Sequence, residues 1–319
     1  MRSCARGPSG RKSAASRVPE PGVSVVCPFR GNVAWLEDAV RSALDQTLPP
    51  LEVIVTSQSP LEETAHLAVW DERVRIVSND GIGAAVARNH GIREARGDLI
   101  AFLDADDVFL PTKLERQIPP MVEQRVAFSH TSYERMKDDG TTINTISSGE
   151  QSGALYPEIL VRCRIATPTV VVRRELLGTD PFRPSPRFDH DTLLWIALAR
   201  RTPFLGIDEP LTRVRVHGRN QAEDPAAQIF AWTSIRDIAL PADPDLPREA
   251  RRRTQFAIYE TLAILERQRG HRLAYTRARL HAKALALWNP ESRTRVRYKR
   301  MKIGGSRLKR RALAHLRRG

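Results

Sequence analysis

The chain has 319 residues, of which 41% are hydrophobic, so it can bury the core of one large α/β domain with an appendage or of two smaller domains. Its three widely separated cysteines match neither a disulfide framework nor a zinc-binding spacing, and a reducing cytoplasm fits this usage. The net charge of +14 is uneven: residues 248–319 hold 22 lysines and arginines against 4 acidic residues, whereas residues 21–247 are acidic overall. A moderately acidic domain between basic ends is therefore expected.

Strand-like and helix-like patterns alternate through the first hundred residues. Short apolar runs predict strands at 23–28, 52–56, 74–77 and 99–103, and apolar residues at helical spacing predict helices around 35–43, 61–70 and 84–95. This alternation is typical of a parallel sheet covered by helices on both faces. Ligands of such sheets bind beyond the carboxyl ends of the strands, so functional residues are expected there.

The segment that follows the last of these strands is acidic. Asp104, Asp106 and Asp107 come directly after the run LIAFL, at a carboxyl end of the predicted sheet. Carboxylates at a D-x-D spacing suit Mg²⁺ or Mn²⁺, which prefer oxygen ligands and often share them with substrate phosphates. The sequence thus predicts a metal and diphosphate site, although the same residues can instead cap the following turn or helix.

Four segments that together span about residues 21–220 form a recognisable series: VSVVCPFRGNVAWLEDAVRSALDQTLPPLEVIV, ARNHGIREARGDLIAFLDADDVFLPTKL, FDHDTLLWIALA and RVRVHG. In their order and spacing they resemble the conserved blocks of the family 2 glycosyltransferases. The resemblance implies a GT-A fold, an α/β fold with a mostly parallel central sheet and helices on both faces. It also implies an inverting transfer of a sugar from a nucleotide-diphospho-sugar donor to a hydroxyl acceptor, such as a glycan, a lipid-linked glycan or an envelope polysaccharide, with Mg²⁺ or Mn²⁺ as cofactor.

The resemblance also assigns roles to residues near the predicted metal site. Asp106 matches the metal ligand of the family, and Asp104 matches the residue that faces the ribose and the diphosphate. His217 matches a late histidine that lies near the metal and the diphosphate, and it follows the predicted strand LTRVRV. Arg215 is a further candidate to bind the donor, because a guanidinium suits the geometry of phosphates.

The block FDHDTLLWIALA contains the candidate general base. Asp191 falls where the family keeps the aspartate that takes the proton of the acceptor hydroxyl, at the start of a predicted helix. His190 departs from the glutamate that usually precedes this aspartate, and Asp189 competes for the same role. These acids can also cap the helix without any catalysis, and capping does not exclude the role of base.

The donor-binding residues at the first two strand ends depart from the family pattern. Pro28 ends the first predicted strand and Phe29, Arg30, Gly31 and Asn32 follow it, where a Tyr-Asn or similar pair is usual. Ser57 and Gln58 follow the second strand, where a paired aspartate usually binds the base. The hydroxyl of Ser57 or the amide of Gln58 can still hydrogen-bond a base. A UDP-sugar is therefore the default donor, and GDP- and dTDP-sugars stay open.

Three further residues are interpreted as structural. Arg88 and Asn89 lie beside the apolar side of the predicted helix 84–95, which favours packing with a polar edge. Cys27 lies within a predicted strand with no base nearby in the sequence, so it is expected to be a small buried hydrophobe. None of the three is assigned a catalytic role.

Composition and the family resemblance together divide the chain into three expected parts. They are a basic disordered tail at 1–20, the glycosyltransferase domain at 21–240 and a basic helical extension at 241–319, in which two apolar stripes predict two helices. No apolar run reaches the roughly 18 to 20 residues of a membrane span. The first residues are basic but lack the apolar core of a secretion signal, so a cytoplasmic protein is expected.

The basic extension predicts contact with a negatively charged surface. It is a candidate for peripheral binding to the anionic inner face of the cell membrane, with a solvated basic end as the simpler interpretation. No specific nucleic acid is expected. The alternative function is a non-catalytic polyanion- or nucleotide-binding protein on a transferase scaffold that has lost activity, which the altered donor loop and the basic extension would suit.

Overall fold

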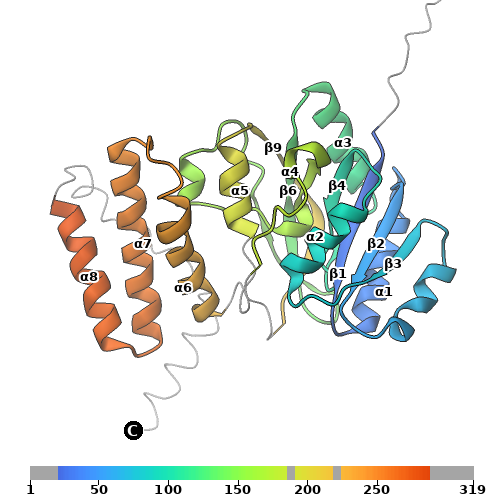
Figure 1. Cartoon of the computed structure of the whole chain (residues 1–319), viewed down its shortest axis with the longest axis horizontal. Coiled ribbons are helices and arrows are strands. Elements are labelled where there is room, and N and C mark those ends of the chain that lie inside the picture. The colour runs from blue at the N-terminus through green and yellow to red at the C-terminus, as the bar shows by residue number, and fades with distance from the viewer. Residues whose placement is uncertain (1–20, 185–190, 218–223, 288–319) are drawn as a thin grey trace, which may run out of the picture. The chain divides into compact units, whose positions relative to one another are not determined.

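A computed structural model describes residues 21–184, 191–217 and 224–287 of the chain (Figure 1). The chain forms two compact units, which divide between residues 220 and 221. Composition placed the boundary between residues 240 and 241. The division falls earlier because the helix α6 (Pro225–Ser234) packs against the helix α7 (Arg248–Gln268) of the second unit.

The first unit is built on one mixed sheet. Its strands are β1 (Val23–Phe29), β2 (Glu52–Ser57), β3 (Val74–Ser78), β4 (Leu99–Phe102), β5 (Val108–Phe109), β6 (Phe128–Met136), β7 (Thr142–Ile146), β8 (Val171–Arg173) and β9 (Phe204–Arg215). Within the described residues, neighbouring strands follow the order β3-β2-β1-β4-β8-β6-β9-β5, and β7 pairs with β6.

The four strands predicted from the sequence make up the parallel half of this sheet. Strand β1 pairs in parallel with β2 and β4, and β2 pairs in parallel with β3. In the other half, β8 runs antiparallel to both β4 and β6, and β9 runs parallel to β6. It follows that β9 runs in the same direction as β4, so both strands end at the same edge of the sheet.

Helices cover both faces of the parallel half, as the alternating pattern predicts. Helices α1 (Val33–Leu44) and α3 (Lys113–Glu123) pack on one face of β1, β2 and β4. Helix α2 (Ala84–Glu94) packs on the other face, where Gly91 contacts β1. A Cβ atom on Gly91 would lie 2.5 Å from Cγ1 of Val26, so this close approach of helix to strand requires glycine.

The segment predicted as a helix at 61–70 is different in the structure. It forms two short 3₁₀ turns, η1 (Leu61–Glu63) and η2 (Ala65–Val69), separated by Thr64. Leu67 is the buried apolar residue of these two turns, whereas Leu61 and Val69 are exposed. A regular helix is stabilised in proteins mainly by the packing of an apolar face, and this segment lacks one of sufficient width.

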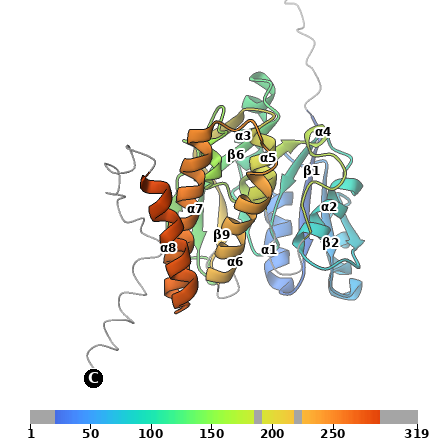
Figure 2. The same cartoon turned by 60° about the vertical axis from the view of Figure 1, so that its left-hand side comes forward.

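The second unit is helical within residues 224–287. Helix α6 continues into the π-helical turn η6 (Ile235–Ala239), and α7 is followed by α8 (Arg272–Leu287), which confirms the two helices predicted in the extension. Figures 1 and 2 both show α7 between α6 and α8. Among the described residues, none of the helices combines the length and the apolar character that crossing a membrane would require.

Candidate functional site

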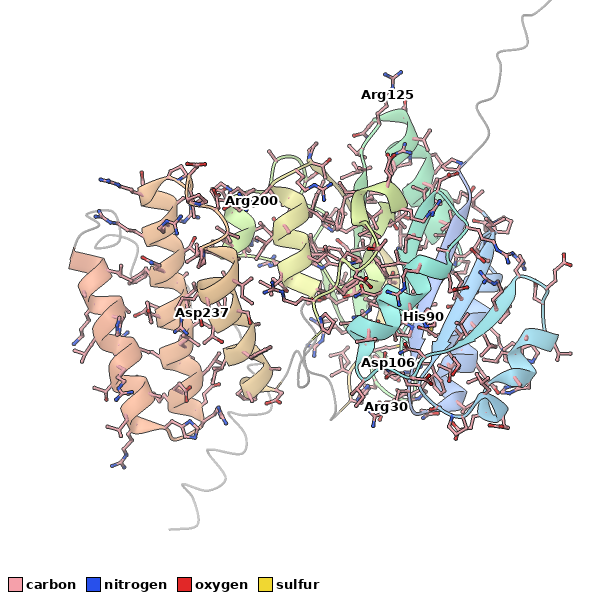
Figure 3. All side chains as sticks on the ribbon, viewed as in Figure 1. Arg30, His90, Asp106, Arg125, Arg200 and Asp237 are labelled. Atoms are coloured by element: carbon pink, nitrogen blue, oxygen red, sulfur yellow. The ribbon has the colours of Figure 1, made fainter. Side chains whose placement is uncertain are left out.

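Polar residues from several chain segments meet at the carboxyl edge of the sheet. The ends of β1, β2, β4 and β9 lie there because these strands run in the same direction. Figure 3 shows Arg30, which follows β1, and Asp106, which follows β4, toward this end of the first unit. The edge is therefore the place where the predicted donor-binding, metal-binding and phosphate-binding residues come together.

Asp106 and His217 form a close pair at this edge. Nε2 of His217 lies 2.8 Å from Oδ2 of Asp106, although 111 positions separate the two residues in the chain. The ring of Trp35, from α1, stacks on the imidazole at a centroid distance of 5.1 Å. Burial and the neighbouring negative charge of Asp104 raise the pKa of Asp106, so a cation at this point would relieve an unfavourable charge.

Asp104 is paired with an arginine that the sequence analysis interpreted as structural. Nη2 of Arg88, on α2, donates to Oδ1 of Asp104 at 2.5 Å. The side chain of Arg88 is 7% exposed, and a buried guanidinium requires such a carboxylate partner. The interpretation of Arg88 as a packing residue is therefore incomplete, because its charge is part of the site.

Asn89 and Cys27, the other two residues interpreted as structural, have structural roles in the fold. The amide of Asn89 donates from Nδ2 to the carbonyl of Phe182 at 2.7 Å and accepts from the backbone N–H of Phe182 at 2.9 Å, so it joins α2 to a distant loop. Cys27 is fully buried within β1, and burial raises the pKa of its thiol well above the usual value. Neither side chain is available for chemistry at the edge of the sheet.

Arg215 and Asp107 connect the end of β9 to the acidic turn. The backbone N–H of Arg215 donates to Oδ1 of Asp107 at 2.8 Å, and its Nε donates to the carbonyl of Asp106 at 2.9 Å. Its Nη1 donates to the carbonyl of Asp138 at 2.7 Å, and the side chain is 4% exposed. These hydrogen bonds of Arg215 help to hold Asp106 beside His217. The contact of Arg215 with the donor stays a prediction.

Asp191 is the first residue of the helix α5 (Asp191–Ala199), as predicted. Its Oδ2 accepts from Oγ1 of Thr167 at 2.6 Å, and its Oδ1 accepts from the backbone N–H of Thr192 at 2.6 Å. The two hydrogen bonds thus hold the carboxylate in one orientation at the start of α5. Asp189 and His190 lie outside the described residues.

A cluster of aromatic rings fixes the helix that carries Asp191. Trp195, one turn after Asp191, is fully buried. Its ring packs against Phe128 of β6 at 5.1 Å, against Phe182 at 6.0 Å and against Phe102 of β4 at 6.2 Å. Because both strands belong to the central sheet, α5 is anchored to the same scaffold that positions Asp106.

Tyr133 is a further titratable residue near the site, on β6. Burial raises the pKa of this phenol, Arg135 opposes that shift, and the negative charges of Asp107 and Asp191 add to it. The sequence contains no pattern that points to Tyr133.

A buried polar cluster supports the turn that carries Thr167. Nζ of Lys113 donates to Oε1 of Gln117 at 2.6 Å and to the carbonyl of Thr169 at 3.1 Å. Nε2 of Gln117 donates to the same carbonyl at 3.0 Å. Thr167 and Thr169 belong to one 3₁₀ turn, η4 (Thr167–Thr169), so this cluster helps to place the hydroxyl that holds Asp191.

The buried lysine predicts a pH dependence of stability. Burial lowers the pKa of Lys113 to about 7, so between about pH 7 and its usual value of 10.5 the unfolded chain binds one proton more than the folded chain. The free energy of unfolding should therefore gain on the order of 1 kcal/mol per pH unit from this group as the pH rises above 7. Lys113→Met should remove that contribution, as measured by urea unfolding at pH 7 to 9.

The exposed Lys137 offers the matched control. Lys137→Met should leave the slope of stability against pH as it is in the parent chain, because Lys137 is exposed and its substitution leaves the buried amine of Lys113 in place. The comparison is between variants, so the titration of the buried thiols is common to all three proteins. Equal slopes for Lys113→Met and the parent chain would contradict the assigned shift.

The five donor residues predicted at the first two strand ends differ in their surroundings. Pro28 and Phe29 are buried because β1 continues through Phe29, and Phe29 belongs to the apolar core that includes α1; their contact with a donor stays a prediction. Arg30 is exposed at the edge. Oγ of Ser57 donates to the carbonyl of Ser59 at 2.9 Å, and Nε2 of Gln58 donates to the carbonyls of Gly81 and Gly83.

The amide of Gln58 therefore closes the glycine-containing loop that precedes α2. The backbone N–H of Gln58 also donates to the carbonyl of Phe29 at 2.9 Å, and this hydrogen bond joins the ends of β1 and β2. In this arrangement its two amide protons are already engaged with the loop. Any contact with a nucleotide base would use the oxygen of Gln58 or a rearranged loop.

The residues at the edge suit a metal ion that is also bound by substrate phosphates. They do not suit a metal ion whose ligands all come from the protein. Within residues 21–184, 191–217 and 224–287, no three histidine, cysteine or acidic residues are arranged to hold a metal ion. Mg²⁺ and Mn²⁺ are usually bound by one or two protein ligands together with water and substrate phosphates. Asp106 supplies one carboxylate of this kind, and His217 lies beside it.

Comparison with known sequences gives a family. The sequence model described as Glycosyl transferase family 2 matches residues 24–174. The putative teichuronic acid biosynthesis glycosyltransferase TuaG of Bacillus subtilis is 34% identical over 227 residues, which is 69% of this chain and 89% of that protein. The UDP-Glc:alpha-D-GlcNAc-diphosphoundecaprenol beta-1,3-glucosyltransferase WfaP of Escherichia coli is 35% identical over 206 residues, which is 61% of this chain and 78% of that protein.

Other matches concern larger proteins or the fold alone. The chain spans 29% of the length of an uncharacterized glycosyltransferase of Rickettsia bellii, to which it is 37% identical over 201 residues, 62% of this chain. The crystal structure of S. aureus TarS 1-349 in complex with UDP-GlcNAc matches with a TM-score of 0.58 at 15% identity, over 83% of this chain and 89% of that one. The predicted GT-A fold is thereby confirmed.

Proposed function

The chain belongs to glycosyl transferase family 2, and on that premise we propose that it moves a sugar from a nucleotide-diphospho-sugar to a hydroxyl acceptor, with inversion at the anomeric carbon. The observation that carries the proposal is the meeting of Asp106 and His217 at the carboxyl edge of the sheet, 2.8 Å apart, with Asp104 beside them. A site for a diphosphate and a divalent cation needs such a group of ligands.

Asp191 is the general base in this proposal. The oxygen of the acceptor hydroxyl attacks the anomeric carbon from the side opposite the diphosphate, the bond from that carbon to the diphosphate oxygen breaks, and the electron pair leaves with the nucleoside diphosphate. Asp191 takes the hydroxyl proton. Oγ1 of Thr167 and the backbone N–H of Thr192 each donate a hydrogen bond to the carboxylate of Asp191. The carboxylate has further lone pairs that can receive the hydroxyl of the sugar acceptor.

Asp106 and His217 would hold Mg²⁺ or Mn²⁺ together with the diphosphate. Such a cation neutralises the charge that develops on the leaving group. Arg215 and Asp107 fix the acidic turn behind this pair, and Arg88 offsets the charge of Asp104, which faces the ribose and the diphosphate. The acidic turn is thus held in place before the reaction begins, and electrostatic catalysis requires such preorganisation.

A UDP-hexose is the donor that the comparisons favour. The name of WfaP specifies UDP-Glc as donor and a diphosphoundecaprenol-linked sugar as acceptor, and that of TuaG specifies teichuronic acid biosynthesis. A TarS structure of the same fold contains UDP-GlcNAc. We therefore take a lipid-linked or envelope polysaccharide as the acceptor class, and GDP- and dTDP-sugars remain open because the base-binding residues depart from the family pattern.

Thermal unfolding in the presence of UDP, GDP and dTDP, each with and without Mn²⁺, tests this function. A nucleotide at about 100 times its Kd adds about 2.7 kcal/mol of stability, which raises the Tm on the order of 5 °C in a domain of this size. We expect that shift for one nucleotide and only with metal. Binding of a nucleotide without any release of nucleoside diphosphate from its sugar would favour the alternative, a binding protein on a transferase scaffold.

A further inference from the structure

Helix α8 presents its large apolar side chains outward. It buries Ala278 and Ala282, which lie on the side that packs against α7, whereas Leu273 is 80% exposed and Leu280 is 61% exposed. The two leucines are seven positions apart and therefore lie on the same face of the helix. If α8 served only to complete a helical bundle, its leucines would be buried and its alanines exposed, because leucine gains more from burial than alanine.

Basic residues flank the two leucines. Arg277 lies between them on the same stripe, and Arg272 and Lys283 lie along one side of it, all three exposed. Residues 267–287 contain six lysines and arginines and no acidic residue. One of the six, Arg279, is paired with Glu260 of α7 at 2.6 Å, and it is not part of the outer face.

We propose that the outer face of α8, defined as Arg272, Leu273, Thr276, Arg277, Leu280, Lys283 and Ala284, binds the surface of an anionic lipid bilayer. Leucines flanked by lysine or arginine are the combination with which a helix lies in a membrane interface, where the apolar side chains enter the headgroup boundary and the cations meet anionic lipid. The inference goes beyond the proposed transfer reaction and does not depend on it.

Two other occupants fit this face less well. A second copy of the chain, related by a twofold axis, would bring Arg272, Arg277 and Lys283 against the same three cations, which is unfavourable. A stable protein partner buries about 800 Å² on each side, which is far more than two leucines and an alanine provide. A bilayer requires neither shape complementarity nor a minimum area, and an anionic one complements the charge.

Vesicle sedimentation of the full chain tests the inference. The vesicles are phosphatidylcholine alone and an equal mixture of phosphatidylcholine and phosphatidylglycerol. The double variant Leu273→Ser, Leu280→Ser keeps every charge, including those of residues 288–319, and should lower binding to the anionic vesicles at least tenfold. Val69→Ser and Ile143→Ser together form the matched control, since these residues are 85% and 45% exposed in the first unit. The control should bind as the parent chain does.

A variant that binds the vesicles more strongly cannot owe its effect to misfolding, so it complements the double serine variant. Thr276 is exposed beside the leucine stripe, and Thr276→Leu should raise binding to the anionic vesicles severalfold. Equal binding by the parent chain and the double serine variant, or no preference for anionic over neutral vesicles, overturns the inference. So does a parent chain that is a dimer without lipid and becomes a monomer in the double variant, because the face would then join two copies.

Discussion

Asp191→Asn should lower the rate of sugar transfer by on the order of 10² to 10⁴ while the affinity for the donor stays close to that of the parent chain. The amide keeps the size of the side chain, and its oxygen can still accept the hydrogen bond from Thr167 or from the N–H of Thr192. It cannot take the proton of the acceptor hydroxyl. Single-turnover transfer and calorimetric titration with the donor nucleotide measure the two quantities separately.

Two further variants distinguish the base from its surroundings. Thr167→Val removes the hydroxyl that orients Asp191 and should lower transfer on the order of 10-fold, through kcat, because orientation and not proton affinity is lost. Asp189→Asn should retain most of the activity. Nearly normal transfer by Asp191→Asn together with an inactive Asp189→Asn would show that the other carboxylate is the base.

Local patterns predict the parallel half of the fold well. The runs at 23–28 and 52–56 differ from β1 and β2 by one residue at one end, because buried parallel strands are short and continuously apolar. The other half of the sheet has no such pattern. Strand β9 runs from Phe204 to Arg215, and the predicted strand LTRVRV covers only its last five residues, because Gly206, Asp208 and Pro210 interrupt the apolar run.

The sequence predicts the site residues that directly follow strands better than the site residues that lie on helices and turns. Asp106 and His217 lie at strand ends, so the direction of β4 and β9 brings them together. Thr167 and Arg88 act through hydrogen bonds to Asp191 and Asp104, and each pair depends on packing between distant elements. For Arg88 a signal existed, because an arginine on the inner side of a helix requires a carboxylate nearby.

Asp106→Asn should have opposite effects on function and on stability. Without the carboxylate, the shared cation loses a protein ligand, and metal-dependent transfer should fall by on the order of 10² to 10³, since a metal at the leaving group contributes several kcal/mol to the barrier. Without metal and nucleotide, the same variant should be as stable as the parent chain or more stable. Burial and the charge of Asp104 both disfavour an ionised Asp106, and asparagine carries no charge.

The two readouts make the metal assignment testable. Nucleotide affinity, measured by calorimetry with Mn²⁺ and with a chelator, should depend on metal in the parent chain and lose that dependence in Asp106→Asn. Glu123→Gln is the matched control, because it removes one carboxylate from the exposed end of α3 and should change neither affinity nor Tm. If chelation leaves nucleotide affinity unchanged in the parent chain, and Asp106→Asn lowers the Tm without metal, Asp106 is a structural residue of the turn and not a ligand.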